Sequence, residues 1–579
     1  MTDRDDIVAR YLAGDLPQLL VERARRHLTS EDGRAFRAAL EELHNDGTID
    51  LLEIANTISS STIGQHDFFI VMHLYCDLIP NLDAEVPVML GAVKALVARA
   101  GNDLMSSMPN GVYRTWAELG DRARLTLIEI DENDPEDSAY VFLSLQALAK
   151  NSPDEALTKA ISYVEGAAAP ARSAGAKAIG TMALETPVAR ERVADALATA
   201  SGKADDNSLG HILVAICEIA RSNNDMQPSA VALIRTATPN VGDHAIHQLS
   251  LELMFHGEEL PAGIVAGLTA VMHKVAITNS ATLDNIDSAG VKLLTNGRMS
   301  EALALITPLI ARHDELASLE ALDGFSYALR QLAPNVLGEV IVSWLLSSEF
   351  NLGHAALSLV GNHNGDAPLV LEVARATLGL ADSDKVLLAH RAIGYLFIHP
   401  ITAASLVLGI IPGVTETSRK VIVEILFDPL LVNYSGELAS WLTERAQTAS
   451  APLQPILREL LAQLEVYLEG LGKVGWLKEL RPSERERLIE NHRQHESARQ
   501  VHKQAEKRSI LFSLVSRSVI LYGNGSISYY KGPDGENQRN EMKLHSFSHS
   551  FEAPRLDILE PFDLDYKLRV FRTMTLSKS

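Results

Sequence analysis

Cysteine is almost absent from this sequence of 579 residues, which contains only Cys76 and Cys217. Two cysteines cannot build a dense disulfide framework or a zinc site with four thiolates. Both lie within apolar stretches, LYCDL and AICEI. We therefore expect each cysteine to be buried as a small apolar side chain.

Aromatic residues are also scarce, at 5% of the chain, whereas 46% of the residues are apolar. Ala, Leu, Val and Ile dominate the apolar set, a balance that favours close-packed helices over an antiparallel β-sandwich. The longest apolar stretch, residues 395–414, is interrupted by His399, Pro400 and Pro412. Its uninterrupted part of about 11 residues is too short to span a bilayer. We expect a buried helix here with Pro400 in its first turn.

The N-terminus lacks the basic start and apolar run of a secretion signal. We therefore predict a cytoplasmic protein without membrane contact. The sequence also lacks a Walker A motif, a Gly-rich dinucleotide fingerprint, HExxH, an EF-hand loop and GxSxG. The acidic stretch at residues 131–137 has neither the central Gly nor the bidentate Glu of a calcium loop, and we expect a solvated turn before a helix. We assign no catalytic residue, no metal ligand and no cofactor.

The whole chain has a net charge of −22, but its two parts have net charges of opposite sign. Residues 471–579 hold 19 Lys and Arg against 14 Asp and Glu, and residues 1–470 hold 33 against 60. The acidic part repels nucleic-acid phosphates, so any nucleic-acid contact is expected in the C-terminal segment. The alternative is that the acidity only keeps a large helical surface soluble.

Apolar residues recur at three- and four-residue spacing from the N-terminus to about residue 510, which predicts a series of helices. Clusters of Asn, Asp, Ser and Pro separate these segments, for example at residues 151–154 and 205–208. Such clusters supply turns and helix N-caps. We predict helices at residues 154–166 and 187–200 on either side of the stretch 170–180.

The stretch Pro170–Gly180 has a Pro, then Arg172, small residues at 174–176 and 178, and finally Ile179-Gly180. In this pattern it resembles a HEAT repeat. Looser matches at residues 354–361 and 390–397 contain Val360-Gly361 and Ile393-Gly394, whose glycines are 33 residues apart, below the usual HEAT spacing. The resemblance implies a HEAT/armadillo-like α-solenoid, in which small residues let two helices approach and the Gly relieves crowding. An irregular all-α domain is the alternative.

Four regions follow from these patterns. We predict an N-terminal helical region or cap at 1–120, a HEAT-like α-solenoid at 121–470, a charged basic helix at 471–512, and a small β-rich C-terminal module at 513–579. Ser483 and Glu486 form a predicted capping box at the start of the basic helix. The fold class is therefore mainly α, with a small sheet at the C-terminal end.

The β-rich module is predicted from period-two patterns after Ser509. Residues 519–522 and 527–530, joined by Gly523-Asn524-Gly525, are typical of a β-hairpin. A second turn is expected at residues 532–535. Two further strand candidates are residues 542–551 and 566–576, which gives a predicted sheet of three to five strands packed against the solenoid.

One side of the basic helix carries a polar stripe. His492, His495, Arg499, His502 and Glu506 fall within about 80° of one another on a helical projection. His492 and His495 could share a metal ion with a ligand from elsewhere, form a pH-sensitive surface, or contact phosphate. An ordinary solvated face is the simplest interpretation.

The strand candidate at 542–551 places His545, Phe547, His549 and Phe551 on one side. The two histidines are about 13 Å apart along a strand, so they cannot both bind one metal ion. Such a face can stack on bases or pack as core. The residues that we predict to contact a partner or nucleic acid are His492, His495, Arg499, His502, Lys503, Lys507, Arg508, Tyr529, Tyr530, Lys543, His545, His549, Arg555, Lys567, Arg569 and Arg572.

Three functions remain open at this point. The first is a non-enzymatic scaffold that binds a protein partner through the solenoid, within a multi-protein bacterial system such as phage defence. The Ala-rich, Lys-poor composition is the reason for placing it in bacteria. The second is nucleic-acid binding through residues 480–579. The third is a metal-dependent hydrolase or nuclease using His492, His495, His502 or His549.

Overall fold

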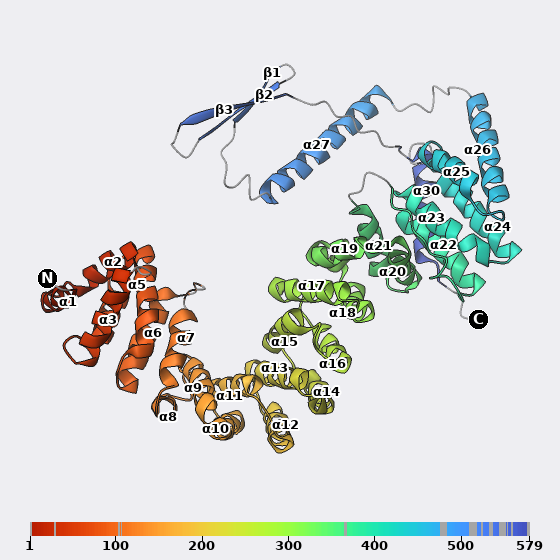
Figure 1. The fold of residues 1–579 in the computed structure, drawn as a ribbon. Helices are drawn as coiled ribbons and strands as arrows, with labels where there is room; N and C mark the ends of the chain where they lie inside the picture. Colours follow the sequence, from red (N-terminus) through yellow and green to blue (C-terminus); the bar gives the residue numbers. More distant parts are fainter. Residues whose placement is uncertain are drawn as a thin grey trace. The chain divides into compact units, whose positions relative to one another are not determined.

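Helices make up most of the chain, as its composition and periodicity predict (Figure 1). The computed structural model describes residues 3–27, 31–101, 103, 105, 107–363, 368–474, 483–508, 518–522, 525–531, 536–543, 552, 554–556 and 560–575. The chain divides into two compact units. Unit 1 contains residues 1–332 and 349–359, and unit 2 contains residues 333–348 and 360–579.

Unit 1 is built from short antiparallel helices. They are α1 (Asp3–Leu12), α2 (Leu16–His27), α3 (Glu31–Asn45), α4 (Leu51–Ser60), α5 (Gln65–Leu78), α6 (Val86–Ala100), α7 (Ser107–Ala117), α8 (Arg122–Glu129), α9 (Ser138–Asn151), α10 (Pro153–Glu165), α11 (Ala169–Thr181), α12 (Pro187–Ser201), α13 (Asp206–Ser222), α14 (Gln227–Ala237), α15 (Asp243–His256), α16 (Ala262–Met272), α17 (Ser280–Thr295), α18 (Met299–Arg312), α19 (Asp323–Arg330) and most of α21 (Phe350–Gly361).

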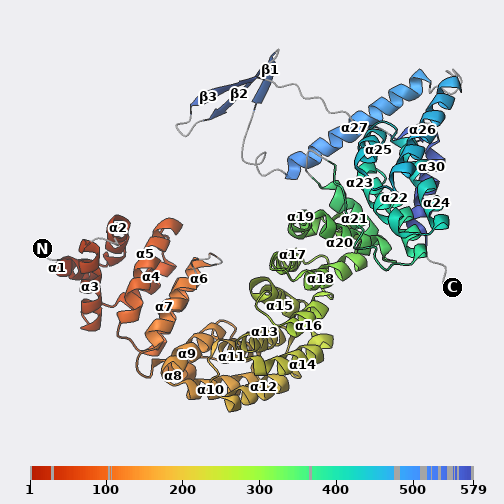
Figure 2. The same cartoon turned by 45° about the vertical axis from the view of Figure 1, so that its right-hand side comes forward.

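Ten helices of unit 1, from α9 to α18, pack in two rows. The odd row consists of α9, α11, α13, α15 and α17, and each of these helices contacts the next one in the row. The even row consists of α10, α12, α14, α16 and α18, which contact one another in the same way. Pairs such as α9 with α10 and α13 with α14 join the two rows, which can be followed in Figures 1 and 2.

The same contact pattern extends toward the N-terminus. Helix α4 contacts α6 and α6 contacts α8, while α5 contacts α7 and α7 contacts α9. Helices on either side of residue 120 therefore pack against one another directly. The sequence did not reveal this regularity, because no stretch in the first 120 residues repeats the small-residue pattern of α11.

Small residues explain how closely the helices of the odd row approach. Helix α11 contains the predicted stretch, and Arg172, Ala174, Ala176, Ala178 and Ile179 are all buried in it. A Cβ atom at Gly180 would lie 3.2 Å from the Cα of Ala215 in α13. At Gly210 of α13 it would lie 2.9 Å from the Cα of Ala245 in α15. These two contacts have no room for a larger side chain.

Several local predictions are confirmed. Cys76 and Cys217 are both buried and free, and burial raises the pKa of the Cys76 thiol to about 12. The apolar stretch after His399 forms the buried helix α23 (Pro400–Ile410), with Pro400 in its first turn. None of the described helices is both long and apolar enough to cross a bilayer.

Unit 2 contains the remaining elements. They are α20 (Pro334–Leu346), α22 (Asp382–Leu396), α23, α24 (Glu416–Ile425), α25 (Glu437–Thr448), α26 (Gln454–Val474), α27 (Glu484–Arg508), β1 (Ser518–Tyr522), β2 (Gly525–Lys531), β3 (Asn537–Lys543) and α30 (Pro561–Thr573). Helix α22 contacts α20, α23, α24 and α30, so it lies at the centre of this unit's helix packing.

Helix α27 begins with the predicted capping box. The hydroxyl of Ser483 accepts the backbone N–H of Glu486 at 3.2 Å, and the Glu486 carboxylate accepts the backbone N–H of Ser483 at 2.7 Å. Leu488 and Ile489 are both exposed, which agrees with the weak apolar stripe of this segment.

The predicted hairpin is present as the antiparallel pair β1 and β2, with Ile520 opposite Ile527. The third strand, β3, pairs with β2 and begins at Asn537, five residues earlier than the strand predicted at 542–551. Only Met542 and Lys543 of that prediction lie in β3, and residues 544–551 fall outside the described part of the chain.

The strand predicted at residues 566–576 is wrong, because this segment forms most of helix α30. The segment has an alternating pattern, but it also has features that favour a helix. Pro561 lies in the first turn, and the ion pairs Asp563–Lys567 and Asp565–Arg569 have i,i+4 spacing. Leu564 is buried, and Phe571 packs edge-on against His390 of α22 at 4.8 Å between ring centroids.

The segment before α30 also returns to the helices of unit 2. The Glu552 carboxylate accepts the backbone N–H groups of Gly436 and Glu437 at 2.8 and 2.7 Å, which caps the start of α25. The backbone N–H of Leu556 donates to Asn433 Oδ1 at 2.7 Å. Residues 552–575 are therefore bound to the helices at both of their ends.

Arg391 of α22 connects this helix to the ends of α20 and α30. Its guanidinium donates to the carbonyl of Leu345 at 2.9 Å and to that of Ser347, at the end of α20. It also donates to the carbonyl of Met574, at the end of α30, at 3.0 Å. The carbonyl ends of two helices thus offset the charge of a side chain that is only 6% exposed.

Replacing Gly210 by Ala tests the close contact between α13 and α15. The added methyl group has to displace backbone atoms of α15, and we expect a loss of about 1–3 kcal/mol in the stability of these helices. Hydrogen exchange of α13 and α15 measures this effect, because a long repeat array need not unfold in one step.

Gly91→Ala in α6 is the matched control. A Cβ at Gly91 would meet no atom within 4 Å, so this change should stabilise its helix by roughly 0.5–1 kcal/mol. Equal effects of the two substitutions on their own helices would contradict the close contact at Gly210.

Candidate binding site

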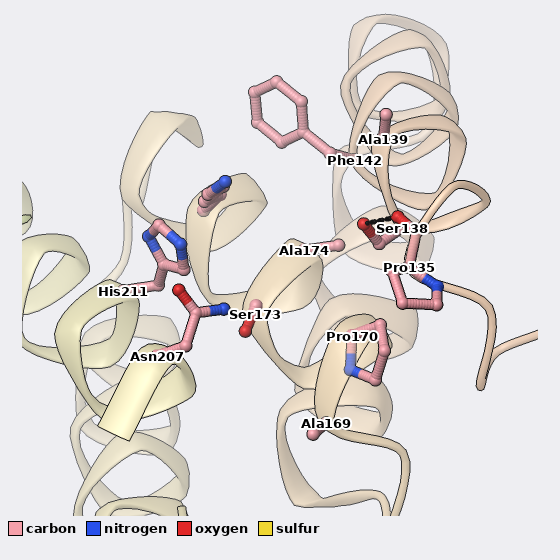
Figure 3. Close-up of a pocket in the computed structure, with 11 residues that line it drawn as sticks. Pro135, Ser138, Ala139, Phe142, Ala169, Pro170, Ser173, Ala174, Asn207 and His211 are labelled. Atoms are coloured by element: carbon pink, nitrogen blue, oxygen red, sulfur yellow. Dashed lines mark hydrogen bonds between the residues drawn. The ribbon is translucent and has the colours of Figure 1, made fainter. Parts of the chain in front are cut away.

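A pocket of about 390 Å³ lies where three neighbouring helices of the odd row begin. Its lining residues come from the start of α9 and the turn before it, from α11 and from the start of α13, and Figure 3 draws them as sticks. They are Pro135, Ser138, Ala139, Phe142, Ala169, Pro170, Ser173, Ala174, Lys177, Asn207 and His211. The volume is within the usual range for small-ligand sites.

Apolar groups form most of the wall. In Figure 3, the Phe142 ring from α9 stands on one side of the pocket, and Pro135 and Pro170 lie toward the other. Ala139 and Ala174 complete this surface with short side chains. The wall therefore suits an apolar group, and any polar recognition has to come from the few polar residues at its edge.

His211 is the most unusual of these polar residues. The side chain lies on α13 and the residue is only 7% exposed, yet its ring makes no hydrogen bond with any described residue. Burial lowers its pKa to about 4, Lys177 acts in the same direction, and Asp205 opposes both. The ring is therefore neutral at pH 7, with ring nitrogens available to a ligand.

Lys177 supplies the second polar group from α11. Its side chain reaches solvent, and it forms no ion pair with a carboxylate in the described part of the chain. The surrounding helices remove part of its hydration, which lowers its pKa. An unpaired ammonium group next to an unbonded imidazole forms a small electropositive region within an acidic protein.

A chain of hydrogen bonds fixes the floor between α11 and α13. The Ser208 hydroxyl donates to the Asp205 carboxylate at 2.6 Å. The Ser173 hydroxyl lies 3.1 Å from that of Ser208 and so acts as the donor between them. Ser173 is therefore occupied by Ser208, and Asp205 also caps α13 by accepting the backbone N–H of Ser208 at 3.1 Å.

The three helix starts differ in how their positive ends are compensated. Asp137 and Asp205 stand at the N-cap positions of α9 and α13. Helix α11 has Ala168 at this position, no side-chain cap and no acidic residue in its first turn. Its unsatisfied backbone N–H groups add to the positive potential near Pro170.

A second polar group lies further along the odd row, at Glu252 of α15. This residue is 5% exposed, and its Oε1 atom has no hydrogen-bond partner within the described residues. Burial, together with the nearby Glu218 of α13, raises its pKa to about 7. Burial also raises the pKa of Glu218, which Arg221 opposes.

Two other pockets, of about 350 and 520 Å³, lie in unit 2. Ser405 in the first donates to Thr402 and accepts from Leu371. Arg419 in the second pairs with Glu416. Among the described residues that line these two pockets, no buried polar side chain lacks a partner, so the pocket at α9, α11 and α13 is the stronger candidate.

The residues predicted on the basic helix lie on α27. His492, His495, Arg499 and Lys503 are exposed there, and His492 Nε2 is 3.4 Å from the Glu496 carboxylate. His495 bonds the backbone carbonyl of Asn491 at 2.8 Å. His502, Lys507 and Arg508 belong to the same helix, and their side chains fall outside the described part of the structure.

The remaining predicted residues lie on the sheet and on residues 552–575. Tyr529 is 43% exposed on β2. Tyr530 and Lys543 belong to β2 and β3, with side chains outside the described part. His545 and His549 are themselves outside the described residues.

Four predicted cations instead make contacts within unit 2. Arg555 donates to the Ser435 hydroxyl at 2.6 Å, and Arg572 donates to the Gly394 carbonyl at 2.6 Å. Lys567 pairs with Asp428 at 3.1 Å, and Arg569 pairs with Asp565 at 2.8 Å. These side chains join residues 552–575 to the helices or stabilise α30.

The sequence did not indicate His211, Lys177 or Phe142 as members of one site. The segment GAKAIG predicts only helix packing, and LGHILV is typical of a core helix with one histidine. A signal was nevertheless present. Lys177 interrupts a run of small residues, and His211 follows the Asp205 cluster by about one and a half helical turns.

Comparison with protein-family models, curated proteins and solved structures finds no match to this chain. Within the described residues, no group of three or more His, Cys, Asp or Glu side chains is arranged to hold a metal ion. The function is therefore inferred from the geometry of the chain itself.

Glu252→Gln tests whether ionisation of the buried Glu252 carboxylate in α15 lowers the stability of the fold. The pKa of Glu252 is raised in the folded protein, so its stabilising contribution is complete below about pH 4.5 and is lost as the pH rises through about 7. Gln cannot ionise, and the variant should gain up to about 3 kcal/mol in stability at pH 8 with little change at pH 4.5.

Chemical denaturation at the two pH values measures this difference. Glu191→Gln, which alters an exposed carboxylate of α12 that does not act on Glu252, is the control. The same gain at both pH values would show that Glu252 is not ionising in the folded protein.

Proposed function

We propose that this chain is a non-enzymatic interaction protein whose helix rows form a HEAT-like α-solenoid. In this proposal the exposed side of the odd row binds a protein partner. The observation that carries it is the regular contact of each odd-row helix with the next one, from α9 to α17. Stacked helix pairs of this kind present a continuous surface rather than a closed pocket.

The side chains along the odd row support this proposal. On α13, His211, Val214 and Glu218 share one side of the helix by their spacing of three and four residues. Val214 and Glu218 are half-buried. This side therefore offers a neutral imidazole, an aliphatic group and a carboxylate in sequence, which suits the mixed side chains of a polypeptide.

The pocket supports binding better than it supports catalysis. A nucleophile needs a base within hydrogen-bonding distance. The Ser173 hydroxyl is bonded to Ser208, and the His211 ring is bonded to no described residue. Its polar groups are therefore arranged to receive a ligand rather than to activate one another.

Nucleic-acid binding through residues 480–579 stays an alternative prediction. The contacts of Arg555, Lys567 and Arg572 within unit 2 leave α27 and the sheet as the parts that would supply it. A cytoplasmic location and a place in a multi-protein bacterial system are likewise predictions from composition.

Partner capture with the full chain tests the proposed function. Purified tagged protein should retain a stoichiometric protein from lysate of its native host, identified by mass spectrometry. Val214→Glu on the odd row should reduce the retained amount at least tenfold, because a charge would enter the centre of the binding surface.

Val188→Glu is the matched control, since Val188 is a 66% exposed residue on α12 of the even row. Capture by this variant should equal that of the wild type. Equal loss in both variants, or no loss in either, would contradict binding through the odd row.

A further inference from the structure

The pocket at α9, α11 and α13 combines one cation, one neutral imidazole and an apolar wall. Lys177 has no carboxylate partner among the described residues, and His211 is 7% exposed without a hydrogen bond. Both residues line the same pocket, so their N–H groups can donate to one ligand there. Two adjacent donors without a protein acceptor favour a ligand with an acceptor group, placed between α11 and α13.

The number of positive groups limits the charge of that ligand. No arginine lines the pocket, so the bidentate fork that favours phosphate is missing from it. Asp205 lies near the His211 ring, and residues 1–470 hold 60 acidic against 33 basic residues. A polyanion would be repelled by this surrounding charge, whereas a single carboxylate matches one ammonium group.

The walls identify what is attached to the carboxylate. Phe142, Pro135, Pro170, Ala139 and Ala174 form an apolar surface beside the polar edge. A carboxylate next to an apolar side chain is the chemical pattern of the last residue of a polypeptide. An internal Asp or Glu would instead place its polar backbone against this wall.

We infer that this pocket binds the C-terminal carboxylate of a partner polypeptide whose last side chain is apolar. The carboxylate accepts from Lys177 Nζ and from the imidazole N–H of His211, and the Asn207 amide at the start of α13 lies beside them. The uncapped N-terminus of α11 adds a favourable dipole. The apolar side chain packs against Phe142. This inference rests on the proposed function, because it names the part of the protein partner that is recognised.

Binding of a carboxylate should depend on pH in a defined direction. The charged groups acting on His211 are Lys177 of α11 and Asp205 at the start of α13. His247 of the neighbouring α15 is bonded to Thr282 of α17 at 3.0 Å. A bound carboxylate raises the pKa of His211 from about 4. Affinity should therefore increase as the pH falls from 7.5 to 5.5, while the ligand carboxylate stays ionised.

Fluorescence anisotropy with two labelled peptides tests the inference on the full-length protein. Both have a Gly-Ser sequence ending in Phe, one with a free carboxylate and one with an amide. We expect the free acid to bind at least tenfold more tightly than the amide, and more tightly at pH 5.5 than at pH 7.5. N-acetylphenylalanine should compete with it, and inorganic phosphate at equal concentration should not.

Two variants of the exposed lysines separate the pocket from general charge. Lys177→Gln should weaken binding of the free acid at least tenfold, and Lys203→Gln, which removes an exposed lysine outside the pocket, should not. His211→Gln should abolish the pH dependence. Circular dichroism confirms that each variant is folded, and because Lys177 reaches solvent its result does not depend on core packing.

Equal binding of acid and amide, stronger competition by phosphate, or an unchanged Lys177→Gln variant would overturn the inference. Such a failure is distinct from failure of the proposed function. Partner capture that is sensitive to Val214→Glu, without peptide binding, would retain the odd-row surface and remove only the carboxylate assignment. Peptide binding without any captured partner would retain the carboxylate assignment and remove the odd-row surface as the binding site of a protein partner.

Discussion

Close backbone contact between successive helices of the odd row is the constraint on which the rest of unit 1 depends. A Cβ atom at Gly180 or Gly210 would lie only 3.2 or 2.9 Å from a Cα atom of the next helix in the row. Each inner helix of the odd row contacts the odd-row helix before it and the one after it, and it also contacts a helix of the even row. Phe142, Lys177 and His211 lie on the parts of these helices that line the pocket.

This arrangement also explains why the pocket combines residues that are distant in sequence. Phe142, Lys177 and His211 belong to three successive odd-row helices, so one even-row helix lies between each pair along the chain. Stacking converts this sequence separation into proximity. A periodic pattern identifies each helix, but it does not fix the rotation of one helix relative to the next. The sequence thus predicted α11 with its small residues, while the shared pocket could not be predicted.

The C-terminal region shows the other limit of prediction from sequence. The capping box at Ser483 and the hairpin β1–β2 depend on neighbouring residues, and both are present as expected. Residues 566–573 have an alternating pattern that also fits a helix, and contacts with His390 and Asp428, far earlier in the chain, accompany the helical form. Local periodicity could not decide between the two forms, because the deciding partners are more than a hundred residues away.

The contacts of residues 552–575 with the helices of unit 2 mean that the segment between Val474 and Glu552 is followed, as well as preceded, by residues that belong to this helix packing. A single cut within this segment would leave two polypeptides that remain associated through Arg391, Glu552 and Phe571, so covalent continuity there is not needed to keep the C-terminal helix in place.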